Sequence, residues 1–180
     1  KAIEAGYRCV KAMGSFVAHV RNATMTKTMD RSKIAALMER NGKIFYKRWG
    51  YPLRVVFILR DAQGAKNLLK NTCMDQNKVI VIVPRNTEVP YEHTNMKVIR
   101  FGRFMFNLKT LAFLLTKRSK KQQKGIDFVF TDDKKTHSFL ELFTGLMPAQ
   151  LVQGPDAREI ETIAARLIKE KKNKDKESIK

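Results

Sequence analysis

Acidic residues and cysteine are scarce in this chain, and it lacks a long apolar run. Only 17 Asp and Glu stand against 36 Lys and Arg among its 180 residues. Cys9 and Cys73 are too few for a disulfide scaffold in a chain that is 43% apolar, so both are expected to be free thiols in a reducing compartment. No apolar run approaches the roughly 20 residues needed to span a bilayer, so we expect no membrane partner.

The usual sequence patterns of a metal or small-molecule site are missing as well. Gly64 is isolated, so there is no glycine-rich phosphate loop. The three histidines, His19, His93 and His137, show neither metal-ligand spacing nor a nucleophile beside them. We therefore expect no cofactor, no bound metal and no small-molecule substrate, which favours a protein that binds over an enzyme.

Positive charge is what the chain has in excess. A net charge of +19 is costly through self-repulsion unless a polyanion neutralises it, and nucleic acid is the commonest such polyanion. The charge is concentrated in residues 1–60, in KRSKKQQK at 117–124 and in the tail from 166 to 180. Each is a place where phosphate could bind; a basic protein without a dedicated partner is the alternative.

Apolar periodicity predicts a chain of mixed helices and strands. Helices are expected over residues 3–20 and over 32–41, the second with an end at Asn41-Gly42. A weak helix is expected over 62–71. Further helices are expected over 108–121, after the strand at 126–130, and from Pro155 onward, the last with a frayed end over 169–180. Strands are expected in KIFYKRW (43–49), LRVVFIL (53–59), KVIVIVP (78–84), twice around Gly102 (96–106) and at 126–130. A second short apolar run follows Gly145.

Several of these segments resemble, in order, the members of one protein family. The matching blocks are FVAHVRNA (16–23), SKI (32–34), ALMERNGKI (36–44), LRVVFIL (53–59), MKVIRFGRFMF (96–106) and 125–151. Over residues 13–152 the chain is similar to the family of small-subunit ribosomal protein number eight, which is found in all ribosomes. An insertion at 62–92, the basic segment 108–124 and the tail after Gly154 fall outside the resemblance. Basic additions to a diverged core are typical of a mitochondrial or other organellar member.

The resemblance implies an α+β fold of two small subdomains with a basic extension. Residues 1–60 would form an N-terminal α/β subdomain with a short sheet, and residues 61–95 an insertion and connecting strand. Residues 96–154 would form a C-terminal β-rich subdomain with short helices that binds rRNA. Residues 155–180 would form a basic helical extension.

The implied function is structural. The chain would bind and stabilise the central domain of small-subunit rRNA and support mitochondrial translation, with rRNA and neighbouring small-subunit ribosomal proteins as its partners. It would lie in the mitochondrial matrix, or otherwise in another organellar or cytoplasmic ribosome. A start at Lys1 instead of Met would fit removal of a transit peptide.

Candidate RNA-binding residues are spread over the whole chain. The family match contributes Arg21, Asn22 and Lys33. The C-terminal subdomain contributes Lys97, Arg103, Thr131, Lys134 and Lys135, the last two from charge and position only. The segment 117–124 adds Lys117, Arg118, Lys120, Lys121 and Lys124 as phosphate contacts particular to this chain.

The turn after the strand at 126–130 departs from the family. There the family has a Ser-Thr-Ser turn that contacts rRNA, and this chain has Phe130, Thr131 and Asp132. Phe130 either stacks on a base or packs in the core, and packing is favoured because apolar strand residues are usually core. The acids at 132 and 133 would repel phosphate unless Lys134 and Lys135 screen them.

Two other functions remain open. The acids Asp127, Asp132, Asp133 and Glu141 could hold a divalent metal, with Lys134 or Lys135 polarising a phosphate, as in a nuclease. Paired acids are equally common in turns for structural reasons. The chain could also be a non-ribosomal RNA-binding subunit of an RNA-processing or ribosome-assembly complex, since both need the same basic surface.

Overall fold

The computed structural model describes residues 30–116, 125–147 and 149–178. The chain divides between Lys43 and Ile44 into two units. The sheet and the helices that pack on it belong to the second unit, residues 44–180. The helix expected over 3–20 and Cys9 lie outside the described residues. Cys73 is a free, buried thiol, and burial raises its pKa to about 11.

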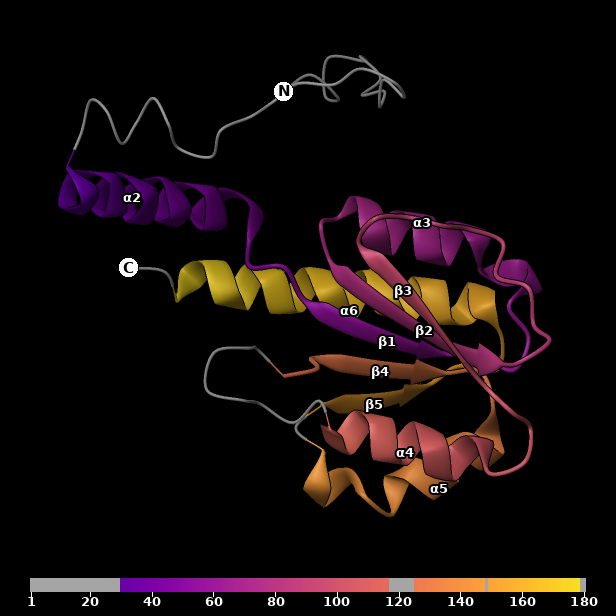
Figure 1. Ribbon diagram of the computed structural model, residues 1–180. Coiled ribbons are helices and arrows are strands. Elements are labelled where there is room, and N and C mark those ends of the chain that lie inside the picture. Colours follow the sequence, from indigo (N-terminus) through magenta and orange to yellow (C-terminus); the bar gives the residue numbers. More distant parts are fainter. Residues whose placement is uncertain (1–29, 117–124, 148, 179–180) are drawn as a thin grey trace, which may run out of the picture. The chain divides into compact units, whose positions relative to one another are not determined.

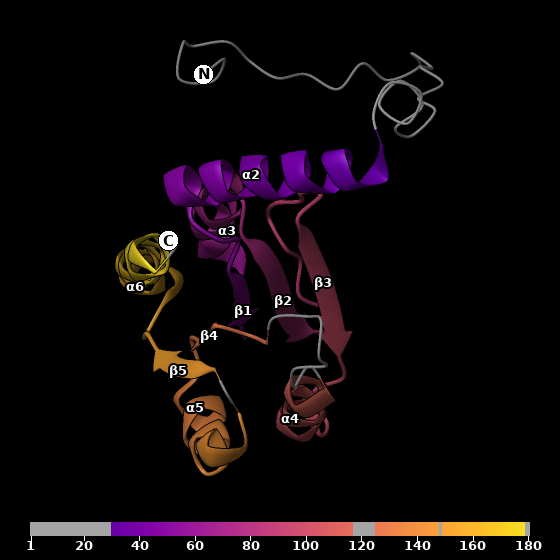
Figure 2. The same ribbon diagram turned by 90° about the vertical axis from the view of Figure 1, so that its left-hand side faces the viewer.

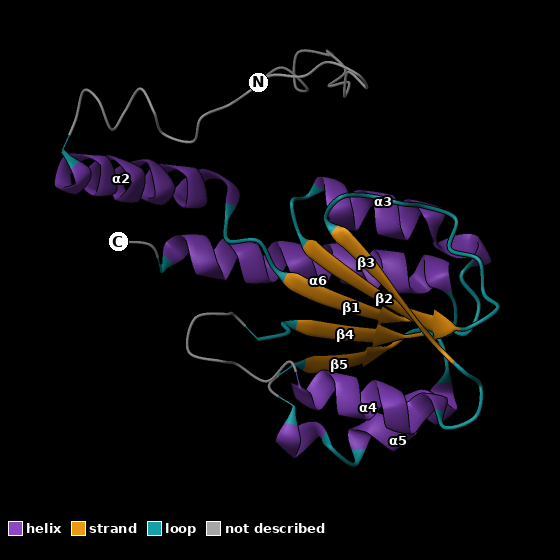
Figure 3. Cartoon of the chain, viewed as in Figure 1, coloured by secondary structure: helices purple, strands orange, loops and turns teal. Residues whose placement is uncertain are grey.

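The described elements alternate between helix and strand over most of the second unit (Figure 3). The helices are α2 (Arg31–Trp49), α3 (Lys66–Met74), α4 (Phe106–Thr116), α5 (Lys134–Glu141) and α6 (Ala157–Glu177), with short 3-10 turns at Gln63–Ala65 and Thr144–Leu146. The strands are β1 (Arg54–Ile58), β2 (Lys78–Pro84), β3 (Met96–Phe101), β4 (Phe128–Thr131) and β5 (Gln150–Gln153).

One parallel sheet of five strands forms the centre of this unit, in the order β3-β2-β1-β4-β5 (Figure 1). From β1 the chain winds outward to β3, crosses back, and continues outward from β4 to β5. The place between β1 and β4 is therefore a topological switch point. Figure 2 shows α3 and α6 on one face of the sheet, with α4 and α5 on the other.

Alternate strand residues supply the two halves of the core. Val55 and Phe57 of β1 face the cluster that contains α3 and α6, whereas Val56 and Ile58 face the cluster that contains α4 and α5. A sheet covered on both faces requires strands that are apolar throughout, which explains the unbroken apolar runs in the sequence. Phe130 is fully buried and stacks on Phe57, with ring centroids 5.4 Å apart. The prediction that Phe130 packs in the core is confirmed.

The mixed α/β character expected from the sequence is present. The expected strands at 53–59 and 78–84, the strand before Asp132 and the weak helix at 62–71 are all found near their predicted places. The finer division into subdomains stays a prediction, but β1, from the expected N-terminal part, pairs directly with β4, from the expected C-terminal part. Strands from both parts therefore share one sheet.

The strand predicted for KIFYKRW, residues 43–49, is wrong, because this segment continues α2 to Trp49. Gly42 was expected to end the helix, but Gly50 does so, with a left-handed φ of +76° and its N–H donating to the Tyr46 carbonyl at 2.7 Å. Glycine is the residue best suited to this position. Basic residues in the last turn, Lys47 and Arg48, also interact favourably with the C-terminal end of the helix.

Two other predicted boundaries need correction. No second strand follows Gly102, because the chain turns there and α4 begins at Phe106, whose side chain is buried under the sheet. The tail expected to fray from Lys169 is helical to Glu177. An ion pair of 3.5 Å between Lys171 and Asp175 spans one helical turn, and such pairs support an exposed helix.

Candidate functional site

The carboxyl ends of β1 and β4 meet at the switch point, where a polar network has formed. The Asp132 carboxylate follows β4 and accepts the backbone N–H of Arg60, at 2.8 and 2.9 Å to its two oxygens, and that of Asp61 at 3.1 Å. Burial raises the pKa of Asp132, an adjacent negative charge on Asp133 adds to the rise, and the backbone hydrogen bonds oppose it. Asp132 therefore joins the two central strands beyond their last paired residues.

Asp133 caps α5, and its pKa is shifted in the opposite direction from that of Asp132. Its Oδ2 accepts the Thr136 N–H at 2.9 Å and the Thr136 hydroxyl at 2.5 Å, and it lies 3.4 Å from Arg60 Nε. Burial by itself acts to raise the pKa of Asp133, but the Thr136 hydrogen bonds and the Arg60 charge outweigh it, so the pKa lies below its ordinary value. Asp133 is thus held as an anion that begins a helix.

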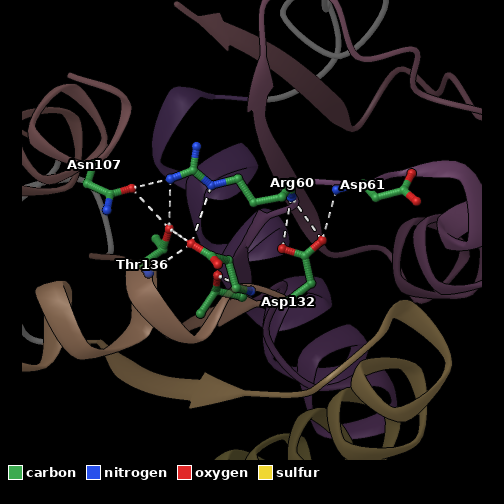
Figure 4. Close-up of polar contacts among 7 residues, drawn as sticks. Arg60, Asp61, Asn107, Asp132 and Thr136 are labelled. Carbon is green, nitrogen blue, oxygen red and sulfur yellow. Dashed lines mark hydrogen bonds and ion pairs between the residues drawn. The ribbon is translucent and has the colours of Figure 1, made fainter. Parts of the chain in front are cut away.

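Arg60 lies across the switch point and contacts both helices of that face (Figure 4). Its Nη2 donates to Asn107 Oδ1 at 2.7 Å and to Thr136 Oγ1 at 3.2 Å. Its guanidinium carbon is 4.1 Å from the centre of the Phe106 ring, within range of a cation–π interaction. Doubly wound proteins usually bind ligands in this crevice, but here the chain's own arginine occupies it.

A hollow of about 420 Å³ adjoins the network at the same edge of the sheet. Its charged lining residues are Arg60, Asp61, Asp132, Asp133, Asp156 and Arg158. Four carboxylates against two guanidinium groups make the hollow unfavourable for a phosphate. This hollow is therefore a poor site for an RNA phosphate.

The acids proposed for a nuclease do not converge. Asp127 precedes β4, at the other end of the strand from Asp132, and its carboxylate accepts the Arg54 N–H at 2.8 Å. Glu141 ends α5, where its carboxylate lies 3.9 Å from His137 Nδ1. In residues 30–116, 125–147 and 149–178, no three His, Cys, Asp or Glu side chains are grouped so as to hold a metal.

Cations gather at the opposite, amino edge of the sheet. Arg54 and Lys78 are aligned as the first residues of β1 and β2, and Lys97 of β3 is aligned with Ile80 two residues further on. All three line a hollow of about 300 Å³ together with Thr94 and Asn95. Within the described part of the chain, none of the three forms an ion pair.

Helix α6 brings further cations to this edge. It follows β5 and runs back along the sheet, so its last turns lie near the amino ends of the strands (Figure 1). Lys169, Lys172 and Lys176 line a second hollow with residues of the segments that precede β1 and β2. The two hollows share no lining residue. Arg54, Lys78 and Lys97 alternate with Val55, Val79 and Met96, which face α6, so their side chains lie on the α4 and α5 face of the sheet, whereas the three lysines of α6 lie on the other. We call these six cations the amino-edge cluster.

The residues predicted to bind RNA do not share one surface. Lys97 belongs to the amino-edge cluster, whereas Arg103, Lys134 and Lys135 are exposed beyond the carboxyl ends of β3 and β4. Thr131 is fully buried, and its hydroxyl accepts the Asp133 N–H at 3.2 Å. Lys33 lies in the first turn of α2, in the other unit, 3.8 Å from Asp30. The candidates outside the described residues are Arg21, Asn22, Lys117, Arg118, Lys120, Lys121 and Lys124.

Arg54, Lys78 and the three α6 lysines were not named individually as RNA-binding residues, although Arg54 and the α6 lysines lie in the basic segments 1–60 and 166–180. A sequence signal for the first two exists, because LRVVFI and NKVIVIV each place a cation immediately before an apolar run. The signal has meaning only once the strands are known to be parallel, since parallel pairing puts all their starts at one edge.

The strand order and the helices on both faces place the chain in the doubly wound class of α/β proteins. Comparison of the chain with protein-family models, curated proteins and solved structures found no match. Of the helices within the described ranges, none has the length and apolar character required to cross a membrane.

Proposed function

We propose that this chain is an RNA-binding protein that acts by binding and not by turnover, with the amino edge of its sheet as the binding surface. The observation that carries the proposal is the alignment of Arg54, Lys78 and Lys97 at this edge, without ion-pair partners among the described residues. Cations placed side by side in this way neutralise consecutive phosphates and release counterions. The aspartates at the opposite edge repel phosphate and so orient the protein on its RNA.

The particular RNA that we propose is small-subunit rRNA, in a mitochondrial ribosome. The ordered resemblance to small-subunit ribosomal protein number eight and the net charge of +19 support this assignment. The chain would stabilise the central domain of the rRNA as a rigid wedge between helices. Because A-form RNA hides its major groove, recognition would rest on shape, phosphates and 2′-hydroxyl groups.

The direct test is the salt dependence of RNA affinity, measured by fluorescence anisotropy of a labelled structured RNA. The combined variant Arg54→Gln, Lys78→Gln and Lys97→Gln removes three amino-edge cations. We expect the slope of log affinity against log salt to become shallower by about two to three. The comparison variant, Lys134→Gln with Lys135→Gln, removes exposed cations at the carboxyl edge and is expected to change the slope by less than about one.

Three outcomes contradict parts of the proposal. A wild-type RNA affinity that does not change with salt concentration would contradict an electrostatic basis of RNA binding. A larger change of the salt slope in the Lys134 and Lys135 variant than in the Arg54, Lys78 and Lys97 variant would place the RNA at the carboxyl edge, as the family turn implies. Metal-dependent RNA cleavage that disappears in Asp132→Ala would favour the nuclease alternative.

A further inference from the structure

A hollow of about 410 Å³ lies between the end of α2 and the last turns of α6. All of its lining residues fall within the second unit, residues 44–180. One wall is formed by Trp49, Gly50, Pro52 and Met74 together with Asp75 and Gln76, and the other by one face of α6. Three cations of the amino-edge cluster, Lys169, Lys172 and Lys176, line this hollow.

The first wall presents exposed apolar and aromatic surface. Trp49 is 40% exposed and Met74 is 52% exposed. The guanidinium carbon of Arg48 lies 5.1 Å from the centre of the Trp49 ring, within range of a cation–π interaction. A large aromatic side chain that is left open to solvent beside cations is the usual platform for a nucleic-acid base.

The second wall is basic and has a fixed geometry. Lys169, Lys172 and Lys176 recur at helical spacing on the face of α6 that lines the hollow. Lys172 is half-buried, and its Nζ donates to the Asp75 carbonyl oxygen at 2.5 Å. A Cβ on Gly50 would lie 3.2 Å from the Lys172 Cβ, so the segment after Trp49 packs closely against α6. The ammonium groups of Lys169 and Lys176 remain available to bind a ligand.

We propose that this hollow binds one unpaired base of single-stranded RNA, stacked on Trp49, with the flanking phosphates held by Lys169 and Lys176. The inference rests on the proposed RNA-binding function and names the part of the RNA that this surface takes. Charge complementarity argues for the occupant, because a polyanion with flat apolar faces satisfies both walls. Duplex RNA keeps its bases stacked and would reach only the lysines.

Trp49 is the one tryptophan of the chain, so its fluorescence reports on this hollow alone. The full-length protein is titrated with a twelve-residue oligouridylate, with a duplex of the same length, with polyphosphate and with polyglutamate. We expect the single strand to quench the emission, and we expect the duplex and polyphosphate to bind with little quenching. In parallel, the affinity for a labelled single strand is measured by anisotropy.

Variants then separate stacking from charge. Trp49→Ala is expected to weaken single-strand binding at least about fivefold, and Trp49→Phe is expected to retain most of the affinity, because a base stacks on either ring. Phe104→Ala is the matched control, since Phe104 is an aromatic residue that is 86% exposed beyond the carboxyl end of β3. If Trp49→Ala fails to fold by circular dichroism, Lys169→Gln with Lys176→Gln replaces it, with the same expected loss.

Each contrary result has a distinct meaning. Tight single-strand binding with unchanged Trp49 emission, and with Trp49→Ala equal to wild type, overturns the base site and leaves the proposed RNA-binding function intact. Equal quenching by polyphosphate overturns stacking in favour of charge alone. Stronger quenching by polyglutamate assigns the hollow to an acidic peptide. Absence of any RNA binding overturns the proposed function itself.

Discussion

Asp132 and Asp133 are adjacent in the sequence, yet the fold moves their pKa values in opposite directions. Asp132 loses hydration beside β1, and burial raises its pKa despite three backbone hydrogen bonds. Asp133 lies at the start of α5, where Thr136 and Arg60 lower its pKa. The pair that first suggests a catalytic site is thus two structural groups with different tasks, one joining strands and one capping a helix.

This difference predicts opposite contributions to the pH dependence of stability. A raised pKa in the folded state means that the contribution of Asp132 is present at low pH and is lost as pH rises through its folded pKa, above the ordinary value of about 3.9. The lowered pKa of Asp133 means that its contribution is present above the ordinary value and is lost as pH falls through its folded pKa.

Urea unfolding between about pH 2.5 and about pH 7 tests this prediction, since the range brackets the ordinary aspartate pKa. The free-energy gap between wild type and Asp132→Asn is expected to narrow as pH rises, and the gap between wild type and Asp133→Asn to narrow as pH falls. The slopes of these free-energy gaps against pH are compared, and not the gaps themselves, because each variant also loses hydrogen bonds worth about 1–3 kcal/mol. Gaps that change in the same direction would contradict the assignment.

The sequence alone identified these two acids but not their roles. Asp132-Asp133 was equally compatible with a metal site and with a turn. The contacts that decide between them come from Arg60 and Asn107, which lie 72 residues and 25 residues before Asp132 in the chain. No local pattern connects residues at such separations, so this part of the site was not predictable.

At the scale of elements, α2 shows where local patterns mislead. KIFYKRW carries aromatic and β-branched residues that favour a strand, but it continues a helix that has already been nucleated, and adding a turn to an existing helix is easier than starting a strand. Either of two glycines, Gly42 or Gly50, could end the helix, and of the two only Gly50 has the left-handed φ of a helix C-terminus. The unbroken apolar runs of β1 and β2, in contrast, were read correctly.

The junction between β5 and α6 gives a prediction about packing. A Cβ on Gly154 would lie 2.5 Å from Ile160 Cγ1 and 3.2 Å from the Ile160 backbone nitrogen. Ile160 is fully buried in the core, so its side chain has little room to move. Gly154→Ala is expected to lower the free energy of unfolding by about 1–3 kcal/mol, measured by urea denaturation.

Gly102→Ala is the matched control for this prediction. A Cβ on Gly102 would meet nothing within 4 Å, so the same chemical change is expected to be neutral or slightly stabilising, by no more than about 1 kcal/mol. Equal stability of the Gly154→Ala variant and wild type would show that α6 packs less closely on the end of β5 than the structure indicates.

At the scale of the whole second unit, charge is divided between the two edges of the sheet. The amino edge has the six cations of the amino-edge cluster, and the carboxyl edge has the hollow lined by four aspartates. An excess of positive charge is a property of the composition, but the placement of these six cations at one edge follows from parallel pairing and from the return of α6 along the sheet. This placement is the physical basis of the proposed RNA orientation.

The ribosomal assignment makes a prediction about assembly in the cell. In a sucrose gradient of native lysate, followed by antibody, the chain is expected to sediment with the small ribosomal subunit at low salt and to remain there at moderate salt. The variant that lacks the cations of Arg54, Lys78 and Lys97 is expected to leave the subunit at a lower salt concentration, because fewer phosphates are neutralised.

Two results would change that assignment. Sedimentation as a small complex that retains RNA would favour the non-ribosomal alternative, an RNA-processing or assembly subunit. Sedimentation without RNA, at every salt concentration, would contradict RNA binding altogether. In either case the resemblance to small-subunit ribosomal protein number eight would carry no functional meaning for this chain.

The sequence by itself determined the basic character of the protein, the apolar runs that become β1, β2 and β4, and the amphipathic stripe of α6, because composition and short-range periodicity are local properties. Only the tertiary structure decided which cations lie together, that Thr131 is buried and that Arg60 fills the switch point. Parallel strands pair across long stretches of chain, so residues such as Arg54, Lys78 and Lys97 become neighbours through a register that no single segment encodes.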